Sequence, residues 1–356
     1  MSVPTRRPAS GVERFLLELP KVELHVHLEG ALGAGTLLKL ARRRGVALPA
    51  TTEEGLAEWY RFRDFDHFVE IYLAISRCLR DPEDFQLMVE DFLAEQARQN
   101  VFYTEAHFTI STHWANGANA GEVAVAMAEA IADGERRWGT RLRLIPDIVR
   151  NESFERADMT VEWALDHRDH GVVALGIAGI ERYPSEPFRQ HFAAAKAEGL
   201  HRVAHAGEQC GPESIRAALA DCDPERLGHG IRAVDDPELL ERIAESQMPV
   251  EVCPSSNVCL GLAESHEIHP FGEMRRAGLE LSLNSDDPPL FGTDLVGEYV
   301  RAAEAFDLSP RDLADLALAA VRHSFLDDEE RTRRLAELPG RYDELAREIL
   351  GRGLED

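Results

Sequence analysis

The sequence lacks the features of secreted, membrane-spanning and nucleic-acid-binding proteins. Its 356 residues include five cysteines and no C-x-x-C pair, which favours free thiols in a reducing compartment. No run of 18 apolar residues is present, and the N-terminal segment contains no apolar core of signal-peptide length. Lys and Arg number 39 against 64 Asp and Glu, so the net charge of −25 opposes binding to phosphate backbones. We therefore expect a cytoplasmic protein with no nucleic-acid or membrane partner, and the sequence indicates no particular protein partner.

Nucleotide-phosphate motifs are missing too, because no P-loop occurs and no G-x-G-x-x-G follows a strand-like segment. What is present is an alternation of short apolar, β-branched segments with longer amphipathic stretches. The eight strand-like segments are residues 22–28, 102–108, 141–149, 172–178, 201–205, 226–229, 249–253 and 279–284. Eight such units predict an α/β fold, a single (β/α)₈ TIM barrel spanning residues 1–356, rather than an open sheet.

Two regions exceed a minimal barrel. Residues 34–100 have helical patterning and form an insertion after the first strand, and residues 309–352 are expected to form extra C-terminal helices. An insertion after the first strand lies on the catalytic face of such a barrel. The aromatic-rich run at residues 59–68 predicts packing within the inserted helices or, alternatively, a lid over a site.

The first strand carries two histidines in alternate positions. Because strand side chains alternate between faces, Glu23, His25 and His27 are expected to share the face that points into the barrel. Two imidazoles at this spacing can reach one metal ion, although a pair of hydrogen-bonded core histidines would give the same pattern.

Three later strand ends carry further polar groups. His205 and Glu208 flank a glycine after the fifth strand, His229 lies between two glycines after the sixth, and Asp286 and Asp287 follow the eighth. Each motif alone also fits a hydrogen-bonded core histidine or a surface turn. Together, the set His25, His27, His205 and Asp286 supplies three nitrogens and one oxygen at strand ends, which suits one Zn²⁺ per chain with an open position.

Four motifs in this order resemble the adenosine/adenine deaminase branch of the amidohydrolase superfamily. They are HVHLEG at residues 25–30, HAGE at 205–208, GHG at 228–230 and SDDP at 285–288. The resemblance implies that His25, His27, His205 and Asp286 bind zinc, which would lower the pKa of a water molecule to about 7. It implies that Glu208 protonates N1 of a purine, that His229 orients or deprotonates the water attacking C6, that Asp287 contacts N7, and that the backbone of Gly179 meets N3.

The substrate implied is a 6-aminopurine nucleoside of the adenosine type, converted to the 6-oxo product and ammonia. Glu29 stands where nucleoside-specific members often have the aspartate associated with the ribose hydroxyls. His107 replaces an arginine common in the family, and Gly176 and Ile180 replace both aspartates of D-L-A-G-D-E. These departures leave open a 6-aminodeoxyfutalosine deaminase of a menaquinone route and an adenine deaminase.

Alternatives outside this reaction are weaker. A different amidohydrolase that cuts an amide or phosphoester is disfavoured by the adjacent aspartates combined with Glu208. A catalytically dead purine-binding homologue is disfavoured because no polar residue of the implied site is missing. The cytidine-deaminase class is excluded because its H-x-E…P-C-x-x-C set is absent.

Overall fold

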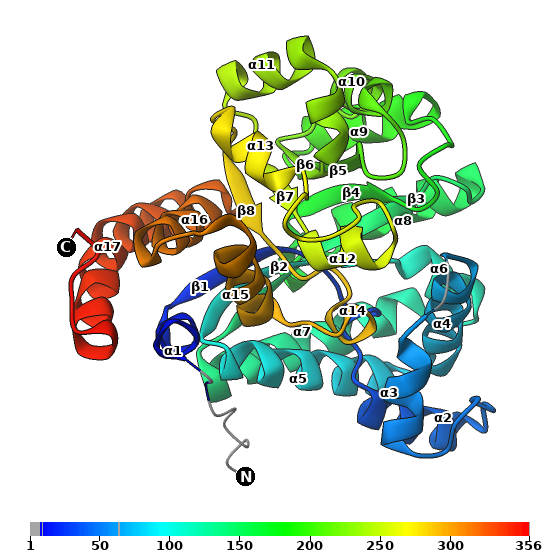
Figure 1. Ribbon diagram of the computed structural model, residues 1–356. Helices are drawn as coiled ribbons and strands as arrows, with labels where there is room; N and C mark the ends of the chain where they lie inside the picture. Colours follow the sequence, from blue (N-terminus) through cyan, green and yellow to red (C-terminus); the bar gives the residue numbers. More distant parts are fainter. Residues whose placement is uncertain (1–7, 9, 63–64, 356) are drawn as a thin grey trace.

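The computed structural model describes residue 8 and residues 10–62 and 65–355, and it confirms the predicted (β/α)₈ barrel (Figure 1). Eight parallel strands follow one another around the sheet in chain order. They are β1 Lys21–His27, β2 Val101–Phe108, β3 Arg141–Val149, β4 Ala174–Ala178, β5 His201–Ala206, β6 Arg226–His229, β7 Val250–Val252 and β8 Leu281–Leu283. The central residues of these strands are buried, as expected for a sheet covered by helices on its outer face.

Helices surround the strands and extend the barrel at two places. Between β1 and β2 lie α2 Ala34–Arg44, α3 Glu53–Tyr60, α4 Phe65–Cys78 and α5 Pro82–Arg98. The chain also forms α1 Gly11–Glu18, α6 Ile110–Ala115, α7 Ala120–Trp138, α8 Phe154–Asp166, α9 Arg189–Ala197, α10 Pro212–Asp221, α11 Pro237–Ser246, α12 Pro254–Cys259, α13 Phe271–Arg276, α14 Pro288–Phe291 and α15 Leu295–Phe306. The C-terminal helices α16 Pro310–His323 and α17 Asp328–Leu350 complete it, with 3₁₀ turns at Arg168–His170, Glu186–Phe188 and Ile231–Asp235.

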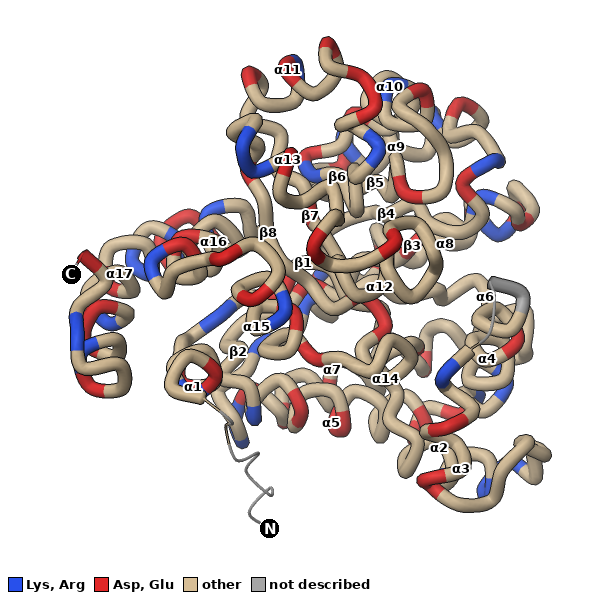
Figure 2. Tube along the Cα trace, viewed as in Figure 1, with Lys and Arg blue, Asp and Glu red and all other residues tan. Residues whose placement is uncertain are grey.

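The outer surface is charged and mixed in sign. Acidic and basic residues are interspersed along the outer helices, without one continuous basic segment (Figure 2). Within the described part of the chain, no helix combines the length and apolar character needed to cross a bilayer.

The barrel closes where β8 meets β1. The residues following β8 pair with β1 through Val26 and Asp286, and the His27 N–H donates to the Asp286 carbonyl at 2.8 Å. Next to this pairing, the Asn284 side-chain oxygen accepts hydrogen bonds from the backbone N–H groups of Leu24 (2.9 Å) and His25 (3.1 Å). A side-chain amide therefore stands in for a missing backbone carbonyl, and the closure brings Asp286 beside the two histidines of β1.

An irregularity in β1 overturns one expectation. Glu23 pairs with Thr104 whereas Val26 pairs with Ala106, so β1 has one more residue than β2 over this stretch. Such a bulge reverses the alternation of side chains. Glu23 accepts hydrogen bonds from Gln96 of the outer helix α5 and, at 3.0 Å, from the Ser285 backbone. The prediction that Glu23 shares the inward face of His25 and His27 was therefore wrong.

The aromatic run at residues 59–68 packs within the inserted helices where it is described, and its alternative role as a lid stays a prediction; residues 63 and 64 lie outside the described part. Tyr60 is buried and donates to the Leu32 carbonyl at 3.0 Å, within the inserted helices. Phe62 packs edge-on to Phe68, and Phe68 stacks on Phe291 of α14 with ring centroids 5.8 Å apart. The insertion is thereby joined to the loop that follows β8.

We expect Asn284→Ala to destabilise the barrel closure. Two buried N–H groups of β1 would lose their acceptor, which costs about 1–3 kcal/mol for each unsatisfied group. Ser282→Ala is the matched control, because it removes a polar group of β8 that contacts only the Asn284 amide nitrogen. Urea denaturation should show a lower midpoint for Asn284→Ala and a nearly unchanged one for Ser282→Ala; equal midpoints would contradict the closure role of Asn284.

Candidate metal centre and active site

A cavity of about 240 Å³ opens at the carboxyl ends of the strands. Seven of the predicted site residues line it, namely His27, Gly179, His205, Glu208, His229, Asp286 and Asp287. His25 and Glu29 do not line it, and both are fully buried behind its wall. The predicted residues that follow the carboxyl ends of the strands thus lie close together, as active-site residues do in other TIM barrels.

The four predicted metal ligands converge at the floor of this cavity. The His27 Nε2 lies 3.2 Å from the His205 Nε2 and 3.3 Å from an Asp286 carboxylate oxygen. The His25 Nε2 lies 3.5 Å from the same oxygen. Donor atoms that share one zinc at about 2.1 Å lie about 3.4 Å apart in a tetrahedral site. These three separations fit that spacing. The compact donor groups among the described residues join His25 with His229 and Asp286, and His25 with His107 and His205, so a cluster that could hold a cation lies here.

The remaining ring nitrogens of two of these ligands are held from behind. The His25 Nδ1 lies 2.9 Å from a Glu251 oxygen, and the His205 Nδ1 donates to the Ile177 carbonyl at 2.9 Å. A ring nitrogen that donates to a carboxylate or carbonyl leaves the other nitrogen as a lone pair. The Nε2 atoms of His25 and His205 are therefore available to a cation. Burial lowers the pKa of His25, but the Asp286 and Glu251 carboxylates outweigh burial and raise it to about 10, so the cluster favours a positive charge at this point.

Glycines leave space for the side chains of the site, and Asp286 has a strained backbone conformation. A Cβ on Gly228 would lie 2.8 Å from the His25 ring, and a Cβ on Gly30 would lie 1.5 Å from an Asp287 oxygen. Asp286 itself has φ of +64°, in the left-handed region that non-glycine residues rarely adopt. Strain of this kind persists where the surrounding structure fixes the residue, as at active sites.

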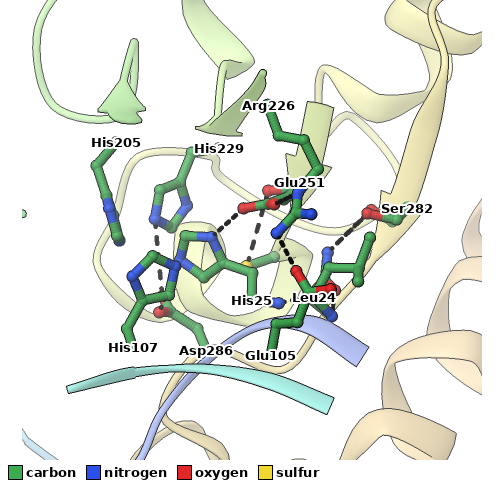
Figure 3. A network of polar contacts seen from close by, with 12 residues as sticks. Leu24, His25, Glu105, His107, His205, Arg226, His229, Glu251, Ser282 and Asp286 are labelled. Carbon is green, nitrogen blue, oxygen red and sulfur yellow. Dashed lines mark hydrogen bonds and ion pairs between the residues drawn. The ribbon is translucent and has the colours of Figure 1, made fainter. Parts of the chain in front are cut away.

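A buried ion-pair network behind His25 was not predicted. The Arg226 guanidinium pairs with Glu251, which holds His25, and with Glu105 on β2 (Figure 3). The Arg226 side chain also lies over the Phe325 ring at 3.8 Å. Glu105 and Glu251 lie inside strands and Arg226 begins β6, and all three are buried. A charged residue in a buried strand was the signal that could have found them.

The two adjacent aspartates have opposite electrostatic environments. Burial raises the pKa of Asp286, but the hydrogen bond to His25 and the nearby His229 and His27 outweigh burial and keep it low. Burial and the Asp286 charge both raise the pKa of Asp287 well above its usual range. One Asp287 oxygen has no hydrogen-bond partner among the described residues. Asp286 can therefore act as an anionic ligand and Asp287 as a neutral hydrogen-bond donor.

Glu208 is placed to donate a proton. Burial, together with the charges of Asp286 and Glu181, raises its pKa to about 8. Its loop is organised by Glu181, a residue whose role was not predicted. The Glu181 carboxylate accepts hydrogen bonds from the backbone N–H groups of residues 207–210, including Cys210 at 2.8 Å, and from the Ser214 hydroxyl. The position of Glu181 just after β4, in the segment LGIAGIE, was the available signal.

A chain of hydrogen bonds fixes the tautomer of His229. The Phe271 N–H donates to the His269 Nδ1 at 3.0 Å, so the His269 Nε2 carries a proton and donates to the Asn257 oxygen at 3.0 Å. The Asn257 amide nitrogen then donates to the His229 Nδ1 at 3.3 Å. Burial lowers the pKa of His229 to about 3, so the ring is neutral and its Nε2–H points toward Asp286 and Glu208.

Glu29 lies behind the cavity wall, and Gly179 is part of it. One Glu29 oxygen accepts hydrogen bonds from the Thr109 N–H (2.9 Å), the Thr109 hydroxyl (2.6 Å) and the His113 Nε2 (2.9 Å). The other oxygen has no partner among the described residues. Gly179 has φ of +92°, and a Cβ there would lie 2.8 Å from the Asn151 side chain, which explains the glycine at this turn.

Known proteins share this sequence and architecture. The family model described as adenosine deaminase matches residues 20–339. An aminodeoxyfutalosine deaminase of Streptomyces avermitilis is 40% identical over 91% of this chain and 91% of its own length, and an adenine deaminase of Streptomyces coelicolor is 37% identical over 91% and 96%. The crystal structure of a Burkholderia ambifaria amidohydrolase with bound zinc is 26% identical, covers 97% of this chain and 96% of its own, and superposes with a TM-score of 0.90. The chain described here therefore belongs to the adenosine deaminase family, the hydrolases that act on C–N bonds of cyclic amidines.

Proposed function

We propose that this protein is a zinc-dependent deaminase of a 6-aminopurine nucleoside, forming the 6-oxo purine and ammonia. The observation that carries the proposal is the grouping, in one cavity, of a metal-donor cluster, a carboxyl group protonated at neutral pH and a second neutral carboxyl. Hydrolysis of an aromatic C–NH₂ bond needs a nucleophilic water, a proton for the ring nitrogen and a proton for the departing ammonia.

The residues around the cavity divide these tasks. Zinc, when bound by His25, His27, His205 and Asp286, supplies the Lewis acidity that makes hydroxide accessible near neutral pH. Glu208 gives its proton to N1 of the ring, so that C6 accepts the nucleophile. The resulting Glu208 carboxylate takes up one proton of the water, and the second proton of the water passes to the amino group, which leaves as ammonia. The His229 Nε2–H donates a hydrogen bond to the attacking oxygen and orients it, because Asn257 leaves His229 no free lone pair for accepting a proton. Asp287, held neutral, donates to N7.

The outer cavity wall favours an extended apolar substituent on the nucleoside. It is formed by Phe68, Val69, Tyr72, Leu73, Ile180, Leu260 and Phe291. Leu73 is 45% exposed, so this wall runs from the buried catalytic groups to the surface. No lysine or arginine is found among the described residues that line the cavity, which disfavours a phosphorylated substrate. A nucleoside with an uncharged, apolar 5′ extension satisfies both conditions.

A second candidate is deamination of free adenine, and the environment of Glu29 favours it. Three donors from Thr109 and His113 already satisfy one oxygen of that carboxylate. Glu29 therefore offers a substrate only its other oxygen, which weakens recognition of two ribose hydroxyls. Substrate comparison separates the two candidates.

We expect ammonia release to be fastest with 5′-extended nucleosides, followed by adenosine, and slowest with adenine and adenosine monophosphate. Glu29→Ala removes a buried hydrogen-bond partner worth about 1–3 kcal/mol, so kcat/KM for nucleosides should fall roughly 5- to 150-fold while adenine is little affected. Adenine as the best substrate, with Glu29→Ala acting equally on adenine and adenosine, would replace the nucleoside assignment with the adenine one.

Glu208→Gln should fold and bind metal but lower kcat by about 10²- to 10⁴-fold, the usual contribution of a general acid. Because the active form of Glu208 is protonated, activity of the wild-type enzyme should fall as pH rises through the pKa of this group, at or below about pH 8, since a bound cation lowers the value. Glu213→Gln, at an exposed carboxylate of α10, is the control. A near-native kcat in Glu208→Gln would remove Glu208 as the proton donor.

Asn257→Asp tests the orientation of His229. An ionised aspartate would accept from the His229 Nδ1–H and leave the Nε2 as a lone pair, so we expect kcat to fall about 10²-fold or more with KM nearly unchanged. The added negative charge also raises the pKa of His229, and the protonated ring regains its Nε2–H, so activity of the variant should recover as pH falls through that pKa, a rise that the wild-type enzyme lacks. An unchanged pH profile with normal kcat would show that this amide does not set the tautomer.

A further inference from the structure

We infer that His107 on β2 is a further metal ligand of this centre, a role that neither the sequence motifs nor the named relatives assign to it. The inference does not depend on the proposed substrate, because it concerns only how the protein holds a cation.

His107 lies against the donor cluster. Its ring centroid is 4.7 Å from that of His25, 4.9 Å from that of His27 and 4.8 Å from that of His205. Nitrogen atoms of His25, His107 and His205 form one of the compact donor groups that the described residues contain, and Figure 3 shows His107 beside His205 and Asp286. The imidazole is fully buried.

The hydrogen bonding of His107 repeats that of His25. The His107 Nδ1 lies 2.9 and 3.1 Å from the two oxygens of Asp147, as the His25 Nδ1 lies 2.9 Å from Glu251. In both rings the Nε2 has no hydrogen-bond partner among the described residues. An imidazole held through one nitrogen by a carboxylate, with the other nitrogen free, is the usual arrangement of a metal-bound histidine. Burial raises the pKa of Asp147, and a cation held by the cluster opposes this by favouring the carboxylate.

Two departures from the family motifs are explained together by this pair. His107 stands at the position where arginine is common, and Gly176 at the position of an aspartate. A Cβ on Gly176 would lie 2.0 Å from an Asp147 oxygen, so the glycine on β4 makes the space that the Asp147 carboxylate occupies. Asp147 reaches from β3 into that space and holds His107. At the positions where the family has an arginine and an aspartate, this chain therefore has His107 and Gly176, and Asp147 supplies the carboxylate that holds the imidazole.

With His107 the protein offers four imidazoles and one carboxylate. Zinc usually takes four ligands and sometimes five, whereas an ion that accepts six keeps one position open beside these five donors. We therefore expect that, with His107, the centre binds six-coordinate as well as four-coordinate metal ions. Without His107 it should favour ions that take fewer ligands.

Cobalt-loaded full-length protein provides the test. We expect the visible absorption of cobalt in the wild type to have the low intensity of a six-coordinate ion, and this intensity to increase in His107→Phe. X-ray absorption should show one imidazole ligand fewer in His107→Phe than in the wild type. Cobalt loss to a chelator should be 10- to 100-fold faster in His107→Phe and faster to a lesser degree in Asp147→Asn. His323→Phe removes an imidazole paired with Glu280 at the opposite end of the barrel, and should match the wild type in every measurement.

Equal spectra, imidazole counts and chelator kinetics in wild type and His107→Phe would overturn the inference. If circular dichroism shows that His107→Phe does not fold, X-ray absorption of the cobalt-loaded wild-type protein is the test. Three imidazole ligands would exclude His107, and four would include it. None of these measurements uses turnover, so their outcome is separate from that of the substrate comparison.

Discussion

The convergence of three imidazoles and the Asp286 carboxylate at the carboxyl end of the barrel is the constraint on which the rest of the site depends. The Nε2 atoms of His27 and His25 on β1 lie 3.3 and 3.5 Å from an Asp286 oxygen, and the Nε2 of His205 on β5 lies 3.2 Å from that of His27. The Asp286 carboxylate favours a positive charge beside it, and burial strengthens this attraction. The closing contacts of Asn284 and Asp286 with β1 bring these groups together, so the seam of the barrel and the metal centre are one structural feature.

Burial also assigns different roles to similar side chains. Asp286 and Asp287 are neighbours in sequence, yet one is kept ionised by histidines and the other is kept neutral by burial and by the charge of its neighbour. Glu208 is neutral for the same physical reason, whereas Glu181, a few ångströms away, accepts several hydrogen bonds and serves as an anchor for the loop. The reaction chemistry of a family hydrolase therefore depends on where carboxyl groups are buried as much as on which residues are present.

Much of the fold was predictable because its signals are local. A buried parallel strand is a short apolar run, and a crossover helix is a longer amphipathic one, so eight repeats predicted the barrel. The positions of His205, His229 and Asp286 at strand ends then implied a shared site, because the carboxyl ends of parallel strands meet on one face. The prediction for Glu23 failed because alternation assumes a regular strand, and the bulge in β1 depends on pairing with β2, which the sequence of β1 does not contain.

The sequence predicted the barrel from its eight repeats, and it predicted four metal ligands and Glu208 as a proton donor from short motifs at strand ends. Only the tertiary structure decided how those groups are held. Glu251 reaches His25 from a strand more than 200 residues away in the chain, Asn257 sets the hydrogen bonding of His229, and Asp147 reaches His107 across the space left by Gly176. Such partners have no fixed spacing in the sequence, because their positions depend on the packing of distant elements and on the space each side chain leaves for the next.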